Sequence, residues 1–213
     1  MKYYPEQSNP NQFLIDVAIA GIAEGFINKI ESANSNRGDY KYVNLFPGEH
    51  YRFIKAVTQF LQPRVMVEIG TYSGLGALAL VEGNPSGHVH TFDLVAWDKI
   101  PTHLEAIDFE YAITQHLADL SDDDVFEEHI KLLDSADLIF MDAPKDGKFE
   151  PKMIENLKSL QPKDGRLLII DDIILDDSMT KLWRSIRAPK MDLTSICHWS
   201  GTGLVDLSNP SHL

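Results

Sequence analysis

The sequence predicts an α/β fold: a doubly wound sheet of seven strands, mostly parallel, with extra helices at its N-terminal side. From residue 64 onward, short apolar stretches typical of strands alternate with stretches of helical periodicity. A glycine-rich turn follows the first of these strands. The last two strands have no helix between them, so they should form a hairpin and leave one strand antiparallel near the C-terminus.

Two helices are expected before the sheet begins. A polar loop at 32–42 separates a first helix at 12–31 from a second at 48–61, which ends near Pro63. In the first helix, apolar side chains recur every three or four positions, at Ile15, Ile19, Ile22, Phe26 and Ile30. This stripe is expected to pack on another surface.

The strands and helices of the sheet region alternate in a regular order. The helices are expected at 75–83, 100–107, 122–133, 150–160 and 179–186. The strands are expected at 64–70, 88–94, 110–116, 136–142 and 165–172, followed by a final pair at 192–199 and 202–207. Ligands of such sheets bind at the carboxyl ends of the strands, near the point where the strand order reverses.

Length and composition indicate one globular domain. The chain has 213 residues, of which 44% are hydrophobic and 24% charged, close to the average for such a domain. We expect a single domain over residues 1–213, in which 1–62 form a helical lid or dimer segment and 63–213 form the ligand-binding α/β core. The single cysteine, Cys197, excludes an internal disulfide and is expected to be a small buried side chain.

The charge of the chain argues against some partners. Lys and Arg number 19 against 32 Asp and Glu, which gives a net charge of −13, and the positive residues are scattered. Such a surface repels phosphate backbones, so a nucleic-acid partner is disfavoured. No apolar stretch approaches the roughly 20 residues that span a membrane, and the first residues lack the apolar centre of a signal peptide. We therefore expect a cytoplasmic protein without a membrane partner.

The stretch "EIGTYSGLGALAL" carries glycines at Gly70, Gly74 and Gly76 as it turns from the first strand into a helix. Their order, G-x-x-x-G-x-G, differs from the G-x-G-x-x-G of dinucleotide-binding proteins, and the lysine of a P-loop is absent. The loop therefore suits a nucleoside ligand without a pyrophosphate; the alternative is a tight turn that binds nothing. Asp93 ends the second strand, where an acid can accept hydrogen bonds from both ribose hydroxyls.

Three carboxylates end the fourth and fifth strands: Asp142 on the fourth, and Asp171 and Asp172 on the fifth. Neighbouring strands lie about 4.8 Å apart, so these groups would repel each other unless a cation held them. We predict a divalent metal bound by all three, Mg²⁺ first, with Mn²⁺ and Ca²⁺ as alternatives. Both Asp171 and Asp172 reach one ion only if the chain turns there. A helix cap at Asp142 and a solvated strand end are the alternatives.

Lys145 follows Asp142 by three residues. A lysine beside a cation loses proton affinity, so Lys145 is a candidate base for a hydroxyl that the metal activates. A surface lysine is the alternative. The eight histidines show no H-x-x-x-H spacing, so we interpret them as surface or core residues and assign no zinc site.

These motifs together resemble the metal-dependent, class I S-adenosylmethionine O-methyltransferases of the catechol and caffeoyl-CoA type. Residues 43–80 are similar to the family's segment from the entry loop to the glycine loop, and "FMDAPKDG" is similar to its D-x-x-K segment. "GRLLIIDDIIL" resembles its next strand, which usually ends in Asp-Asn, and "GTGLVDL" resembles its closing strand. The resemblance runs from about residue 43 to about residue 207 and implies a Rossmann-like methyltransferase fold.

The resemblance also implies roles for individual residues toward S-adenosylmethionine. The methionine part would lie against Val43, Asn44 and Leu45, and Asp93 would hold the ribose. Asp119 would lie by the adenine amino group, with a backbone contact from Ala118. The residues that would shape the rest of the pocket are Glu68, Gly70, Tyr72, Ser73, Gly74, Gly76 and Asp142. Gly76 departs from the family's common serine, which removes one contact to the methionine carboxylate.

The expected function is transfer of a methyl group from S-adenosylmethionine to a hydroxyl of a small molecule, a catechol-like or vicinal diol, with Lys145 as base. The N-terminal helices would serve as a lid or as the face of a homodimer. Trp97 and Trp199 could line the site, with core packing as the alternative. Three rival functions are a sugar or natural-product O-methyltransferase, a tRNA hydroxyuridine methyltransferase and a cofactor-binding protein without catalysis. Retention of D-x-x-K and the acid pair argues against the last.

Overall fold

The computed structural model describes residues 7–33, 35, 43, 50–197 and 199–213. Within them, one sheet has the order β3-β2-β1-β4-β5-β7-β6, and β7 runs antiparallel to both of its neighbours. The first five strands pair in parallel. This confirms the predicted fold class. The strands are β1 Val65–Ile69, β2 His88–Asp93, β3 Ile113–Leu117, β4 Leu138–Met141, β5 Leu167–Asp171, β6 Lys190–Asp192 and β7 Thr202–Asp206.

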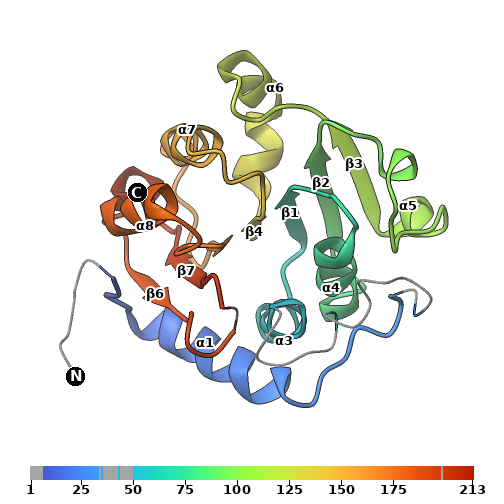
Figure 1. Cartoon of the computed structure of the whole chain (residues 1–213), viewed down its shortest axis with the longest axis horizontal. Helices are drawn as coiled ribbons and strands as arrows, with labels where there is room; N and C mark the ends of the chain where they lie inside the picture. The colour runs from blue at the N-terminus through green and yellow to red at the C-terminus, as the bar shows by residue number, and fades with distance from the viewer. Residues whose placement is uncertain (1–6, 34, 36–42, 44–49, 198) are drawn as a thin grey trace.

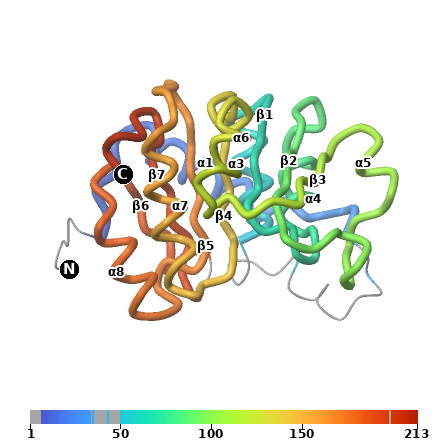
Figure 2. Tube along the Cα trace, turned by 90° about the horizontal axis from the view of Figure 1, so that it is seen from above, coloured from blue at the N-terminus to red at the C-terminus, as the bar shows by residue number. Residues whose placement is uncertain are grey.

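Helices cover both faces of the sheet (Figure 1). One face carries α1, α3 and α4, and the other carries α6, α7 and α8. The short α5 lies at the β3 end of the sheet, and α8 and the C-terminus lie at the β6 end (Figure 2). The helices are α1 Gln12–Gly25, α3 Tyr51–Leu61, α4 Leu75–Gly83, α5 Asp108–Tyr111, α6 Asp123–Ser135, α7 Phe149–Leu157 and α8 Asp177–Ser185, with 3-10 turns at Trp97–Lys99 and Pro210–His212.

The central strands are buried on both faces because both faces are covered by helices. Every residue of β4 and β5 is buried. Side chains alternate along β4, so Leu138 and Phe140 belong to the core beneath α1, α3 and α4, whereas Ile139 and Met141 belong to the core beneath α6, α7 and α8. This double burial explains why these strands are continuous apolar runs in the sequence.

The prediction of a helix at 100–107 is wrong. The helical residues in this part of the chain are Trp97–Lys99 and Asp108–Tyr111 instead. The Thr102 hydroxyl donates to the Ser73 carbonyl oxygen (3.1 Å) and accepts from the Leu104 amide (3.0 Å), so side-chain bonds replace a helical ladder there. The segment thereby lies against the glycine loop.

The prediction of a strand at 192–199 is also wrong. The strand β6 is Lys190–Asp192 and ends where the predicted strand was expected to begin. The Asp192 carboxylate accepts from the Thr194 amide (2.8 Å), and the amides of Ile196 and Cys197 both donate to the Leu193 carbonyl oxygen (2.8 and 3.0 Å). These bonds form a turn, so a longer loop than predicted joins β6 to β7. Cys197 is buried, as expected.

The first helix is confirmed, but it ends at Gly25 and the predicted stripe is buried only in part: Ile22 packs against the core, and Ile30, beyond the helix, belongs to it. Ile19 and Phe26 are each 62% exposed. The buried side is smaller in volume: Leu14, Val17, Ala18, Gly21 and Gly25. A Cβ on Gly21 would lie 2.5 Å from the Phe53 ring, so this glycine sets the close approach of α1 to α3.

No helix among the described residues has the length and apolar character that crossing a bilayer requires.

Substitution of Gly21 by leucine is expected to lower the free energy of unfolding by about 1–3 kcal/mol, because Phe53 and Val57 of α3 occupy the space that the new side chain needs. Urea denaturation measures the change. Ala23→Leu places the same side chain on the exposed side of α1 and is expected to change stability by less than about 0.5 kcal/mol. Equal losses in both variants would contradict the close α1–α3 contact.

Candidate functional site

The candidate site lies at the carboxyl ends of the strands, where the strand order reverses between β1 and β4. Glu68 in β1, Asp93 at the end of β2, Asp142 after β4 and Asp171 at the end of β5 all lie at or near this edge. The parallel sheet therefore brings together carboxyl groups that are up to about one hundred residues apart in the chain.

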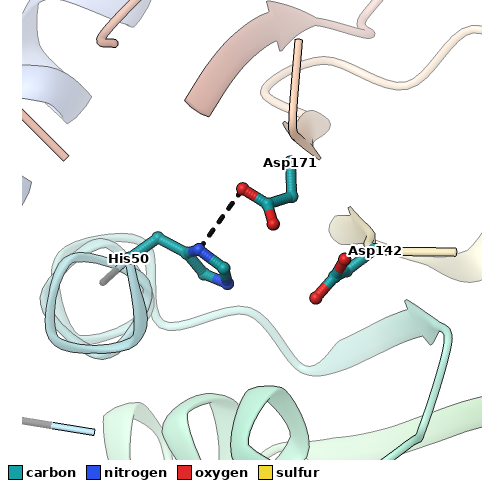
Figure 3. Close-up of side chains that lie close together, drawn as sticks. All are labelled: His50, Asp142 and Asp171. Carbon is teal, nitrogen blue, oxygen red and sulfur yellow. Dashed lines mark ion pairs between the residues drawn. The ribbon is translucent and has the colours of Figure 1, made fainter. Parts of the chain in front are cut away.

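A histidine and two of the predicted carboxylates converge at the ends of β4 and β5. One donor atom each from His50, Asp142 and Asp171 lies within 4.8 Å of the other two. The Nδ1 atom of His50 is 3.3 Å from Asp171 Oδ1, and both side chains are buried. Figure 3 shows the three side chains approaching from separate elements: the residue before α3, the loop after β4 and the end of β5.

Asp172 leaves the strand in another direction. Its φ of 62° is in the left-handed region, so the chain does turn at this residue although no glycine or proline marks the turn. Asp172 Oδ1 accepts a hydrogen bond from the Ser200 hydroxyl, and Oδ2 lies 3.4 Å from Lys145 Nζ. Of the three predicted metal ligands, the structure thus places Asp142 and Asp171 beside His50, and Asp172 beside Lys145 and Ser200.

Lys145 joins the two carboxylate positions. Its Nζ donates to Asp142 Oδ1 (2.9 Å) and to the Ala143 carbonyl oxygen (2.7 Å). Burial lowers the pKa of Lys145, but the charges of Asp142, Asp171 and Asp172 outweigh burial and raise the pKa above its ordinary value. In this state Lys145 is a cation that neutralises part of the cluster.

The residues at this edge fit a divalent cation. Two carboxylate oxygens and an imidazole nitrogen are ligands of divalent metals, and ligands about 2.1 Å from one ion lie about 3–4 Å apart. The three donor atoms here lie within 4.8 Å of one another, with 3.3 Å between His50 Nδ1 and Asp171 Oδ1. The carboxylates of Asp171, which is buried, and Asp142, which is partly buried, at adjacent strand ends also need more positive charge than one lysine supplies. His50 was not among the predicted ligands, because no histidine spacing in the sequence marks it.

A pocket of about 600 Å³ opens beside this cluster. It is lined by four of the predicted cofactor residues, Gly70, Asp93, Ala118 and Asp119, and by both residues between Asp142 and Lys145, Ala143 and Pro144. Its volume and concave, mostly apolar lining suit a ligand of nucleoside size. A Cβ on Gly70 would lie 2.0 Å from the Asp142 carbonyl oxygen, so only glycine lets the loop pass there.

Asp93 fixes the rim of the pocket. Its two carboxylate oxygens accept from the amides of Tyr72 (2.9 Å) and Val95 (3.0 Å), and each oxygen keeps further acceptor capacity. Asp119, which follows the end of the neighbouring strand β3, accepts from the Ser121 amide (2.9 Å) and hydroxyl (2.7 Å), which orients it. Both acids are therefore held in place by the chain itself.

Glu68 lies below the glycine loop. It is fully buried and accepts a 2.5 Å hydrogen bond from the Thr91 hydroxyl. A Cβ on Gly76 would be 2.1 Å from Glu68 Oε1, so the glycine that departs from the expected serine makes room for this carboxyl group. Burial raises the pKa of Glu68 to about 8. Its position indicates support of the loop from inside the core.

The remaining predicted residues are distributed around the loop. Val43 is fully buried in the core beneath α1, α3 and α4. Tyr72 is 73% exposed, whereas Ser73 is buried and accepts from the His103 amide. Gly74, with φ of 82°, lies at the start of α4 against Leu104. The predictions for Asn44 and Leu45 lie outside the described residues.

The two tryptophans differ. Trp97 stacks on Phe109 with ring centroids 4.7 Å apart, which favours the packing role. Trp199 is 73% exposed and adjoins Ser200, the residue that bonds Asp172. Neither Ser200 nor the pocket residue Phe149 was predicted, because both lie in segments without a recognisable motif.

Comparisons with known proteins show the same fold. No model of a known protein family matches the chain, and a search of curated protein sequences finds no match. Among solved structures, an SAH-bound methyltransferase of Podospora anserina is 15% identical with a TM-score of 0.52, covering 92% of this chain and 96% of its own. A methyltransferase of Geobacter sulfurreducens is 17% identical with a TM-score of 0.54, covering 75% and 80%. An O-methyltransferase family protein of Burkholderia thailandensis is 14% identical with a TM-score of 0.54, covering 73% and 54%. The fold implied by the sequence resemblance is thus confirmed.

Replacement of Glu68 by glutamine is expected to change how stability depends on pH. The folded protein keeps the Glu68 proton up to about pH 8, whereas the unfolded chain releases it near the ordinary pKa of 4.5. The contribution of Glu68 to the free energy of unfolding of the wild type therefore falls as pH rises between these values. Glutamine does not titrate, so the variant has no such decrease. Relative to wild type, Glu68→Gln should gain about 2 kcal/mol between about pH 6 and about pH 8.

Urea denaturation at several pH values measures this gain. Glu105→Gln, which removes an exposed carboxyl group, serves as the control and should show no gain that grows with pH. A Glu68→Gln variant whose stability follows that of wild type at every pH would refute the buried, protonated carboxyl.

Proposed function

We propose that the chain is an S-adenosylmethionine-dependent O-methyltransferase that uses a divalent metal and acts on a hydroxyl group of a small molecule. The observation that carries this proposal is that the nucleoside-sized pocket and the charged cluster share one loop. Ala143 and Pro144 line the pocket, while Asp142 and Lys145, which flank them, belong to the cluster. A donor held in the pocket would therefore present its reactive end to the cluster.

The donor would be held mainly by the rim of the pocket. Asp93 is placed to accept hydrogen bonds from ribose hydroxyls while it keeps its bonds to the loop amides. Asp119 and Ala118, which line the same pocket, would lie beside the base. Gly70 allows close approach of the backbone, and Glu68 supports the loop from below.

The cluster would bind and activate the acceptor. A divalent cation held there would lower the pKa of the acceptor hydroxyl and orient it. Lys145 Nζ would receive the hydroxyl proton, which requires a neutral lysine. The neighbouring carboxylates keep Lys145 protonated, so the bound cation would have to compensate the charge of Asp142 and Asp171 in its place. Asp172 and the Ala143 carbonyl oxygen would hold Lys145 in position.

The class of acceptor follows from the same geometry. A metal with open coordination positions next to a base favours two adjacent oxygens, as in a catechol-like or other vicinal diol. The net charge of −13 argues against a tRNA acceptor. A homodimer formed through α1 and the residues after it remains a prediction, supported by the exposed Ile19, Phe26 and Ile27. The single-domain organisation and the cytoplasmic location also remain predictions.

Methyl transfer from labelled S-adenosylmethionine tests the proposal directly. The acceptor panel contains phenols, catechols, sugars and tRNA, each with and without EDTA. Label transfer to a catechol or another diol that EDTA abolishes is the expected result. Methyl transfer that EDTA leaves unchanged would contradict the metal requirement. Tight binding of the donor without transfer to any acceptor would favour a cofactor-binding protein without catalysis.

Asp93→Ala is expected to weaken binding of S-adenosylhomocysteine by about tenfold or more, because the variant loses the charged acceptor for the ribose hydroxyls. Isothermal titration calorimetry measures the dissociation constant. Asp98→Ala removes an exposed carboxylate a few residues further on and should bind as wild type does. If both variants bind equally well, Asp93 does not hold the donor.

Lys145→Met is expected to reduce kcat by about 10²- to 10⁴-fold, since it removes the group that accepts the proton. Binding of S-adenosylhomocysteine should persist, which shows that the variant folds. Lys181→Met, on the exposed side of α8, is the matched control and should keep the wild-type rate. A Lys145→Met enzyme with the wild-type rate would eliminate the base assignment.

A further inference from the structure

We propose that His50 is a direct ligand of the metal together with Asp142 and Asp171, and that this site therefore prefers a transition-series ion such as Mn²⁺, Co²⁺ or Zn²⁺ to Mg²⁺. The inference rests on the proposed function for the presence of a cation at this edge of the sheet. The identity of the ligands and of the ion can be measured without any turnover.

The position of the His50 ring supports the assignment. The imidazole is held between aromatic neighbours, with ring centroids 4.5 Å from Tyr51 and 5.4 Å from Phe140. Only 2% of the residue is exposed. Its ring is turned toward the two carboxylates, which extend toward it from β5 and from the loop after β4 (Figure 3). A buried imidazole fixed in this orientation is suited to ligation, because little freedom is lost on binding.

Asp172 makes a poorer third ligand than the sequence suggested. It bonds the Ser200 hydroxyl with one oxygen and lies 3.4 Å from Lys145 with the other. Asp172 is not part of the group of donor atoms that converge within 4.8 Å of one another among the described residues. His50 already lies within 4.8 Å of the other two donors, so it fills the third position.

The donor set then determines the ion. Mg²⁺ prefers oxygen ligands in near-ideal octahedral geometry, whereas imidazole nitrogen suits transition-series ions. One nitrogen and two carboxylate oxygens resemble the mixed sets that hold Mn²⁺, Co²⁺ or Zn²⁺. Three protein ligands also leave coordination positions for both oxygens of a diol acceptor.

The rival interpretation is a metal-free dyad in which Asp171 orients His50 as a base, since their side chains are 3.3 Å apart. This arrangement would bind no divalent ion at the site. It also gives Asp142 no part in the chemistry, although its donor atom lies within 4.8 Å of the other two. Metal binding separates the two interpretations.

Titration of the full-length protein with Co²⁺ and with Mg²⁺ tests the proposal, by calorimetry and by the visible absorption of bound Co²⁺. Wild type should bind Co²⁺ at least about tenfold more tightly than Mg²⁺. His50→Asn should weaken Co²⁺ binding by about tenfold or more, as expected for loss of a ligand, and change the Co²⁺ spectrum while Mg²⁺ binding changes much less. Asp142→Asn should weaken both ions.

Two controls make the result specific. Asp172→Asn should keep the wild-type Co²⁺ spectrum and weaken Co²⁺ binding less than His50→Asn does, because Asp172 contributes charge beside the site but is not a ligand in this proposal. His90→Gln removes a ring nitrogen that lies 3.0 Å from His116 in a separate histidine pair, and it should also keep the wild-type affinity. Loss of Co²⁺ binding in His90→Gln but not in His50→Asn would overturn the proposal.

Other outcomes decide against the proposal as well. Co²⁺ binding that is unchanged in His50→Asn, or that is lost in Asp172→Asn, would restore the three-carboxylate site. Failure of wild type to bind either ion would favour the dyad. S-adenosylhomocysteine binding, measured on the same samples, reports separately on folding and on the donor site, so failure of the metal assignment is distinguishable from failure of the proposed function.

Discussion

Compensation of negative charge at the ends of β4 and β5 is the constraint on which the rest of the site depends. Parallel strands end at one edge of the sheet, which brings together Asp142, Asp171 and Asp172. The side chain of Lys145 forms ion pairs with Asp142 and Asp172. The buried charge of Asp171 persists only when it is paired or bound to a metal, and the partly buried charges of Asp142 and Asp172 lie beside it. The turn at Asp172, the bond from Ser200 and the approach of His50 each arrange the chain around this requirement.

The fold supplies this arrangement through close backbone packing. Gly70 passes over the Asp142 carbonyl oxygen, which brings the glycine loop against the loop after β4. Ala143 and Pro144 consequently form a wall of the pocket while their neighbours on either side belong to the charged cluster. The distance between a donor and an acceptor would therefore be set by rigid strand ends, with little contribution from mobile side chains.

Much of this arrangement could be predicted from the sequence. The central strands β4 and β5 are continuous apolar runs. The helix at 75–83 and the acids at the strand ends were found where expected. The prediction failed where local side-chain bonds decided the conformation, as at Thr102 and Asp192, and where small residues decided which face of α1 is buried. Periodicity locates an apolar stripe but does not tell whether Gly21 on another side permits closer packing. His50 could not be predicted as a metal ligand, because a single histidine before a helix has no characteristic spacing to other ligands.

The contact between Gly76 and Glu68 links two positions of the chain that are eight residues apart. The carboxyl group occupies the volume that any side chain at position 76 would need. A serine at position 76 would therefore require the Glu68 carboxyl group, the end of a flexible side chain, to shift within the core. Glycine at position 76 thus lets a buried carboxyl group lie directly against the first turn of α4.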